Sequence, residues 1–225
     1  MGGQACVLYG AAEFSRDTDL VILADAANLA RLRKALAALQ ATPIAVPPFE
    51  TKYFRKGHAI HFRCQHPEVL RMRVDVMSKL RGVGSFAGLW KRRTTIQVAQ
   101  GEKYDLLSLP DLVQAKKTQR DKDWPMIRRL LEANYFQNQD RPTVAQIRFW
   151  LNELRTPQLL IEVAVKNSAT AVKLSKQRPL LNFALAGEIE KLAVALAEEE
   201  AAEREKDRRY WLPLLKELEK LRHGN

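Results

Sequence analysis

The stretch DTDLVILAD, residues 17–25, limits the possible folds more than any other part of the chain. Its apolar run is short and rich in β-branched residues, which predicts a strand. Ahead of it, Gly2 and Gly3 open a segment of good helix formers, so a glycine turn, a helix and a strand are expected in succession. Asp17 and Asp19 occupy alternate positions of the strand and therefore share one of its faces.

Two further strands and an amphipathic helix are predicted nearby. Residues 58–64 (HAIHFRC) and 70–77 (LRMRVDVM) both alternate between polar and apolar side chains. Because a turn-like stretch separates them, we expect an antiparallel pair. Leucines at helical spacing in residues 28–39 predict a helix that packs on the sheet. The three prolines of residues 42–50 indicate a connection.

The rest of the chain is predicted to be helical. Helix-start signals stand at three places, namely Ser108 with Asp111, Asp123 with Pro125, and Thr143 with Gln146. Residues 180–209 predict one long helix, and a terminal helix is expected to begin near Pro213. The expected architecture is an α/β (α+β) core with a mixed sheet over residues 1–100, followed by an α-helical domain over residues 101–225.

Composition narrows the class of protein. The chain has 225 residues, of which 46% are hydrophobic, enough to bury a substantial core. No apolar run approaches the roughly 20 residues of a membrane helix, and no secretory signal pattern opens the sequence. Cys6 and Cys64 form no CxxC pair, which fits a reducing compartment. We therefore expect a cytoplasmic protein without membrane association.

The formal net charge of +11 is concentrated near the start of the chain, since residues 1–100 carry 15 basic and 7 acidic residues. A positive field around clustered aspartates indicates a polyanionic partner, such as a nucleoside triphosphate or RNA. Solubility alone is the alternative explanation for the charge.

The aspartates form the first candidate site. Two carboxylates about 6–7 Å apart on one strand face repel each other unless a divalent cation lies between them, and Mg²⁺ prefers oxygen ligands. Alternation in the later strand puts Asp75 on one face with Arg71 and Arg73, which makes Asp75 the candidate third carboxylate. Three carboxylates can hold two Mg²⁺ ions for phosphoryl transfer, and a glycine turn lets backbone N–H groups approach phosphate. The alternative is that Asp17 and Asp19 are solvated turn residues.

The glycine pair, the spacer, Asp-x-Asp and the later strand aspartate together resemble the nucleotidyltransferase superfamily that includes DNA polymerase beta. Within it, GGQACVLYGAAEFSRDTDLVI is most similar to AbiEii-type nucleotidyltransferases, found as toxins in bacterial toxin–antitoxin and phage-defence pairs. LSLPDLVQAKKTQRDKDWPMIRRLLE resembles the helix that those proteins carry after the core. The resemblance covers roughly residues 2–135 and implies Mg²⁺-dependent transfer of a nucleoside monophosphate from a triphosphate to a hydroxyl, which in some members belongs to tRNA.

The resemblance also implies roles for individual residues. It implies that Asp17, Asp19 and Asp75 are catalytic residues and ligands of two Mg²⁺ ions. Nucleotide binding is implied for a wider set, namely Gly2, Gly3, Ser15, Arg16, Arg73, Lys116 and Arg120. Lys117 is the alternative to Lys116, because the spacing to Arg120 is one residue short of the family pattern, and Asp123 falls in the same last segment. A cognate antitoxin protein is the partner that a toxin of this kind implies.

Several alternatives stay open. Family members place a helix and a strand before the glycine turn, whereas this sequence begins at it, so we expect either a longer natural protein or a sheet without its first strand. RNA, tRNA above all, is the preferred acceptor; a protein or small-molecule hydroxyl and a catalytically inactive binding or antitoxin module are the rivals. Zinc at His58, His61, Cys64 and His66 is disfavoured, because alternation turns His61 the other way and separates His58 from Cys64 by about 20 Å.

Overall fold

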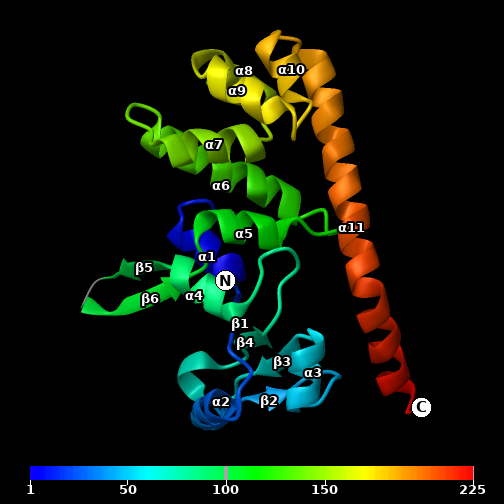
Figure 1. Ribbon diagram of the computed structural model, residues 1–225. Coiled ribbons are helices and arrows are strands. Elements are labelled where there is room, and N and C mark those ends of the chain that lie inside the picture. Colours follow the sequence, from blue (N-terminus) through cyan, green and yellow to red (C-terminus); the bar gives the residue numbers. More distant parts are fainter. Residues whose placement is uncertain (99–100, 225) are drawn as a thin grey trace. The chain divides into compact units, whose positions relative to one another are not determined.

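The computed structural model describes residues 1–98 and 101–224 (Figure 1). The chain forms two compact units, one of residues 1–116 with 207–225 and one of residues 117–206. This division differs from the expected boundary at residue 100. Helix α5 (Leu109–Lys116) packs on α1 (Gly2–Leu8), and α11 (Ile189–His223) contributes its last residues to the first unit. None of the described helices is long and apolar enough to cross a membrane.

A four-stranded mixed sheet forms the centre of the first unit. Its strand order is β1–β4–β3–β2. The strands are β1 (Asp17–Val21), β2 (Thr42–Pro43), β3 (Ile60–Arg63) and β4 (Arg73–Met77). The pair β1–β4 is parallel, while β3 is antiparallel to both of its neighbours. The mixed sheet and the predicted antiparallel pair are therefore confirmed, and the proline-rich connection also contains the short strand β2.

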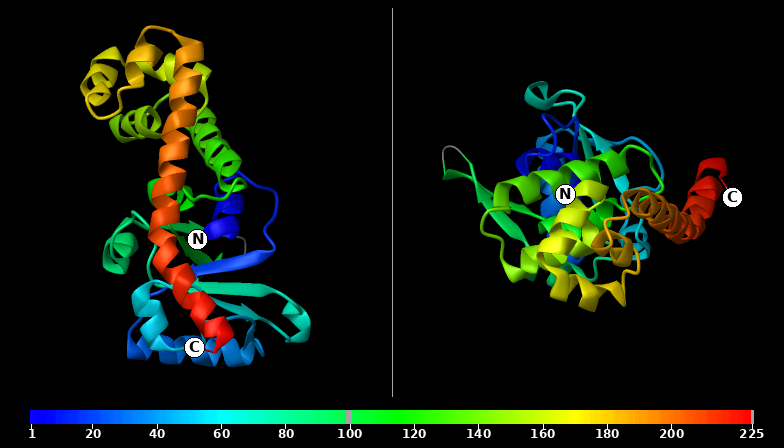
Figure 2. Two further views of the ribbon diagram at one scale, coloured as in Figure 1. Left: turned by 90° about the vertical axis from the view of Figure 1, so that its right-hand side faces the viewer. Right: turned by 90° about the horizontal axis from the view of Figure 1, so that it is seen from above.

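One face of this sheet is apolar and carries the core. Helices α2 (Ala26–Ala38) and α3 (Thr51–Lys56) lie on the same side of the strands (Figures 1 and 2). The buried side chains of this cluster are Leu29, Leu36, Phe54, Ile60, Phe62, Cys64, Val74 and Val76. Because the strand members are all even-numbered, alternation turns the odd-numbered residues of β3 and β4 to the opposite, polar face.

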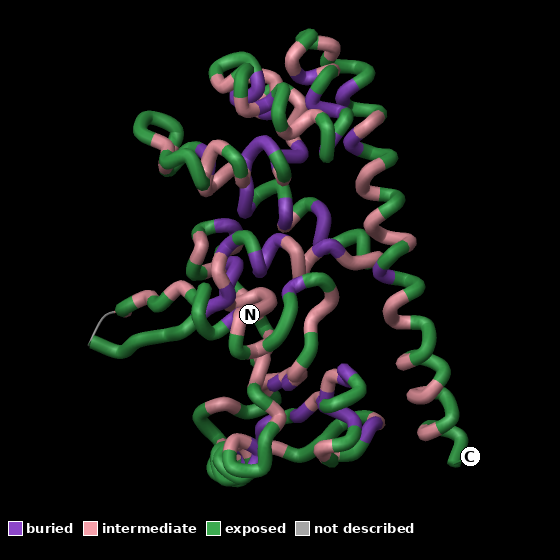
Figure 3. Tube along the Cα trace, viewed as in Figure 1, coloured by how far each residue is buried: buried purple, intermediate pink, exposed green. Residues whose placement is uncertain are grey.

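The first unit also contains a hairpin that the sequence reading missed. Strands β5 (Thr94–Gln97) and β6 (Lys103–Leu106) pair antiparallel and follow α4 (Phe86–Arg92). The 3₁₀ turn η1 (Pro67–Val69) lies earlier in the chain, between β3 and β4. The hairpin is largely exposed (Figure 3). The register puts Ile96, Tyr104 and Leu106 on one face and the charged Lys103 and Asp105 on the other. Each strand has only four residues, so the alternation is too short to predict a strand pair.

The second unit is helical throughout its described residues. Its helices are α6 (Asp123–Asn138), α7 (Val144–Glu153), α8 (Pro157–Lys166), α9 (Ser168–Ser175), α10 (Leu181–Leu185) and the first part of α11. The capping box predicted at Thr143 and Gln146 is present. The core of this unit includes Trp150, Leu151, Leu160 and Leu181, which are almost completely buried.

The last third of the chain differs from the expectation in two places. Residues 180–209 are not one helix, because α10 ends before Gly187, whose φ of 70° is left-handed and stops a helix. No separate terminal helix begins near Pro213, since α11 continues through it to His223. Pro213 is exposed, so water can reach the carbonyl that loses its partner.

Candidate active site

The three predicted carboxylates lie on neighbouring strands of the first unit. Asp19 of β1 is the register partner of Asp75 of β4, and Asp17 is the register partner of Arg73. Adjacent strands are about 4.8 Å apart, so Asp19 and Asp75 are side by side on the polar face of the sheet. The parallel β1–β4 pairing, and not proximity along the sequence, brings these residues together.

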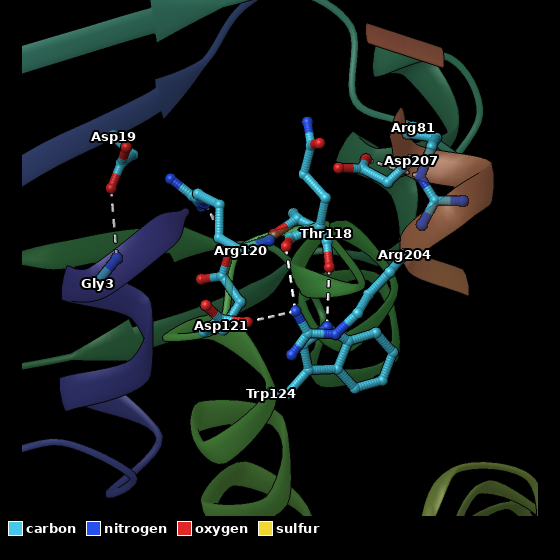
Figure 4. Close-up of polar contacts among 11 residues, drawn as sticks. Gly3, Asp19, Arg81, Thr118, Arg120, Asp121, Trp124, Arg204 and Asp207 are labelled. Carbon is cyan, nitrogen blue, oxygen red and sulfur yellow. Dashed lines mark hydrogen bonds and ion pairs between the residues drawn. The ribbon is translucent and has the colours of Figure 1, made fainter. Parts of the chain in front are cut away.

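The Asp19 carboxylate is partly buried beside helix α1. Its Oδ2 accepts a hydrogen bond from the Gly3 backbone N–H at 3.3 Å (Figure 4). Burial raises the pKa of Asp19, and the nearby charge of Asp75 raises it further against the opposing effect of the Gly3 hydrogen bond. Asp19 is therefore the carboxylate of the site that holds a proton more readily than an exposed aspartate.

Gly2 and Gly3 are required by the close approach of α1 to the start of β1. A Cβ on Gly2 would lie 1.8 Å from Asp19 Oδ2, and a Cβ on Gly3 would lie 2.3 Å from Ser15 Oγ. Gly2 also has a φ of 68°, in the left-handed region. The Ser15 hydroxyl donates to the Asp17 carbonyl at 2.9 Å, which fixes the chain just before the aspartates.

Asp75 has a different environment from Asp19. Its Oδ1 accepts from His61 Nδ1 at 2.8 Å and from Arg73 Nε at 2.8 Å. Burial alone raises the pKa of Asp75, but these hydrogen bonds and charges outweigh it and lower the pKa below its usual value. The pKa of Arg73 is raised, first by its hydrogen bond to Asp75 and then by the charges of Asp75, Asp17 and Asp19. Asp75 is therefore held ionised by its two neighbours.

Lys116, the last residue of α5, belongs to the same unit as the carboxylates. Its positive charge lowers the pKa of Asp19 and that of the amino terminus, which places it within electrostatic reach of both. The alternative residue Lys117 is assigned to the second unit, where its Nζ lies 2.7 Å from Glu153 Oε2. Of the two lysines, Lys116 is the one grouped with the aspartates.

Three arginines named by the sequence reading have other surroundings and, within the described part of the chain, make no hydrogen bond or ion pair with the carboxylates of this group. Arg71 has a φ of 66° and precedes β4, so it is an exposed turn residue instead of a strand residue facing the site. Arg16 is exposed beside Phe14, with its guanidinium carbon 6.0 Å from that ring. Arg120 is part of the second unit, where its Nε donates to Asp123 at 2.7 Å.

His61 is the site residue that the sequence reading missed. It is the register partner of Asp75 on β3, and it was considered only as a zinc ligand. Its odd position in an alternating strand was the available signal, because it shares the polar face with Asp75. Two other residues of the disfavoured zinc set have different partners: His58 Nε2 lies 2.9 Å from Glu217 Oε2, and Cys64 is buried in the core.

The site contains the carboxylate oxygens that a divalent cation needs, but these side chains are now oriented toward other partners. Within residues 1–98 and 101–224, no three His, Cys, Asp or Glu side chains form a group that could hold a metal ion. Asp75 is turned to Arg73 and His61, and Asp19 to Gly3. Yet Asp19 and Asp75 are register neighbours, and the charge of Asp75 raises the pKa of Asp19. Carboxylate oxygens are also the ligands that Mg²⁺ prefers. Metal binding at this site requires the Asp19 side chain to turn from Gly3 and Arg73 to leave Asp75, while the His61 bond to Asp75 Oδ1 leaves the other oxygen open.

The chain was also compared with known proteins: no protein-family model, no curated protein and no solved structure matches it. The function proposed below therefore depends on the residues of the chain and on the resemblance of its motifs.

Proposed function

We propose that this protein is a Mg²⁺-dependent nucleotidyltransferase that moves a nucleoside monophosphate from a triphosphate to a hydroxyl of RNA, with tRNA as the preferred acceptor. We further propose that it acts in the cytoplasm as a component of a toxin–antitoxin or defence pair, with an antitoxin protein as its partner. The observation that carries the proposal is the register pairing of Asp19 with Asp75 on parallel strands, two residues from Asp17.

The roles of the residues follow from their positions. Asp17, Asp19 and Asp75 would hold two Mg²⁺ ions, which when bound polarise the phosphate oxygens and favour ionisation of the attacking hydroxyl. Lys116 is a cation of the same unit within electrostatic reach of Asp19, and it is suited to contact the triphosphate. Gly2 and Gly3 let α1 lie close to Asp19 and Ser15, because a Cβ at either position would clash with one of these side chains.

The transfer itself is a displacement at the α-phosphorus. The acceptor hydroxyl oxygen forms a bond to this phosphorus while the bond from the phosphorus to the bridging oxygen breaks. The electron pair of the broken bond leaves with pyrophosphate, and the hydroxyl proton is lost to water. No oxidant or further substrate is needed.

An RNA acceptor is supported by the charge of the first unit. This unit carries 22 Lys and Arg against 13 Asp and Glu, a formal charge of +9, whereas the second unit carries 15 against 13. A unit with this charge attracts polyanions and disfavours cationic acceptors. Protein and neutral small-molecule hydroxyls are weaker candidates for the same reason.

A second candidate is a nucleotidyltransferase-like module that binds a nucleotide or partner without turnover. The contacts of Asp75 favour it, because the hydrogen bonds from His61 and Arg73 occupy one of its carboxylate oxygens. If Arg73 keeps its bond to Asp75 when nucleotide is bound, its cation stays in the place of a metal ion and the three carboxylates do not converge.

The test is transfer of label from each α-labelled nucleoside triphosphate, with Mg²⁺, to total cellular RNA. The wild-type chain is compared with Asp17→Asn, Asp19→Asn and a control, Asp140→Asn, which changes an exposed carboxylate of the second unit. We expect label on tRNA-sized RNA from the wild type and the control and none from the two site variants. Label on protein or on a small molecule would refute the RNA acceptor, and transfer by the Asp19→Asn variant would refute the site.

A further inference from the structure

Strand β3 brings two polar residues to the face that carries the carboxylates. His61 is the register partner of Asp75, and Arg63 is the register partner of Arg73. Combined with the β1–β4 register, this gives two parallel rows of side chains across three strands. The rows are Asp19–Asp75–His61 and Asp17–Arg73–Arg63.

The second row holds one paired and one unpaired arginine. Arg73 donates from Nε to Asp75 and has a side chain that is 39% exposed. Arg63 lies opposite Arg73 on the neighbouring strand, and the two strands are about 4.8 Å apart. The Arg63 side chain is exposed. Among the residues that the structure describes, no hydrogen bond or ion pair involves the side chain of Arg63, whose backbone pairs in the sheet. It is therefore a cation at the site with no carboxylate assigned to it.

The cations flank the carboxylates from two directions within the first unit. Lys116 ends α5, which packs on α1, and α1 packs on β1. Its charge lowers the pKa of Asp19, which is on β1. Arg73 and Arg63 extend from β4 to β3, away from β1. In an in-line displacement the attacking oxygen and the leaving oxygen lie on opposite sides of the phosphorus. If Lys116 contacts the triphosphate, the acceptor approaches from the side of the two arginines.

We propose that Arg63 and Arg73 bind a backbone phosphate of the acceptor, so that the acceptor is the hydroxyl end of a polynucleotide chain. This inference rests on the proposed function and specifies its substrate. Guanidinium groups present paired donors that match the oxygens of a phosphate, and Arg63 has these donors free. A serine, threonine or tyrosine hydroxyl and a cationic small molecule bring no phosphate of their own to this row.

The test measures RNA binding separately from catalysis. A short single-stranded RNA with a fluorophore at its 5′ end is titrated with the full chain, without triphosphate, over a range of salt concentrations, and binding is followed by fluorescence anisotropy. The variant is Arg63→Gln. The matched control is Arg55→Gln, which removes another exposed arginine of the same unit, on α3 at the opposite sheet face.

Loss of one phosphate contact has a defined size. For single strands the salt slope falls by about 0.7 per contact, which corresponds to about fourfold weaker binding at 0.15 M salt and about eightfold at 0.05 M. We expect this change for Arg63→Gln and a smaller one, without the change in slope, for Arg55→Gln. Equal slopes for the wild type and Arg63→Gln would overturn the inference, as would equal loss in both variants.

The two proposals fail in different ways. If the wild type transfers label to RNA and Arg63→Gln binds and labels RNA as the control does, the acceptor inference is wrong while the function stands. If the wild type transfers nothing to any acceptor, yet Arg63→Gln alone lowers the salt slope, the enzyme proposal is wrong while the RNA contact of Arg63 stands. Label transferred only to protein overturns the inference directly.

Discussion

Removal of the His61 hydrogen bond should weaken metal binding without unfolding the protein. The bond joins Nδ1 to Asp75 Oδ1 at 2.8 Å, and the two side chains are only 27% and 16% exposed. Because Asp75 can only accept when it is ionised, we assign the donated proton to His61 Nδ1, which also lies 3.0 Å from Arg73 Nη2. We infer that His61 positions the Asp75 carboxylate so that the second oxygen remains available to a cation.

The size of the effect follows from this geometry. A hydrogen bond to a charged group contributes about 1.5–3 kcal/mol, and every 1.4 kcal/mol is a factor of ten in affinity. Groups that orient a metal ligand from behind typically change metal affinity by about 10–100-fold when removed. We therefore expect His61→Leu to weaken Mn²⁺ binding by about 10–100-fold. His61→Asn retains an N–H donor near the Nδ1 position and should recover most of this loss.

The assay measures the concentration of free Mn²⁺ by electron paramagnetic resonance while the full chain is titrated with the metal. Thermal unfolding of each variant shows whether it is folded. A structural role alone would lower the melting temperature of both variants and would not distinguish Asn from Leu. Wild-type affinity in the Leu variant, or equal weakening in both, would refute the positioning role. No Mn²⁺ binding by the wild type would refute the metal site itself.

Three other predictions concern the stability of the first unit. Gly2→Ala should lower the free energy of unfolding in urea more than Gly84→Ala does. Both residues have a left-handed φ, which costs alanine about 1–2 kcal/mol. Only at Gly2 would the new Cβ also clash with a carboxylate oxygen. Arg81→Met should cost about 3 kcal/mol, because Arg81 Nε donates at 3.0 Å to the almost fully buried Asp207, and adding Asp207→Leu should restore part of the loss. The pKa of Glu217 is lowered by its hydrogen bonds from Lys56 and His58. Its stabilising effect is therefore present above the ordinary pKa of about 4.3 and is lost as the pH falls through the lowered value. Glu217→Gln should make the melting temperature depend less on pH in this acidic range.

Alternation was sufficient to predict the strands that carry the site. β3 and β4 follow the expected segments closely, and Asp75 faces the side that the pattern assigned to it. The same rule failed for Arg71, because the strand begins only at Arg73 and the residues before it form a turn. Local pattern predicts which face a strand residue occupies, but it does not predict where the strand starts.

Pairing between strands and contacts between distant segments could not be predicted in this way. The hydrogen bond between His61 and Asp75 depends on the β3–β4 register. The residues between the two strands could form turns of several lengths, and each would give a different register. The grouping of residues 207–225 with the first unit depends on side-chain contacts such as Arg81 with Asp207, which are separated by most of the chain. Neither relation leaves a periodic signal in the sequence.

The two register partners at the centre of the site are chemically unequal, and this inequality bears on how a cation would enter. Burial raises the pKa of Asp19, while His61 and Arg73 lower that of Asp75, so a proton shared by the pair resides on Asp19. An incoming cation therefore competes with a proton at Asp19 and with the Arg73 guanidinium at Asp75. Since Arg73 is also in the row with Arg63, release of Arg73 from Asp75 by a cation would free its guanidinium for a phosphate. Cation binding and acceptor binding are then coupled through one arginine, and each should strengthen the other by the same factor.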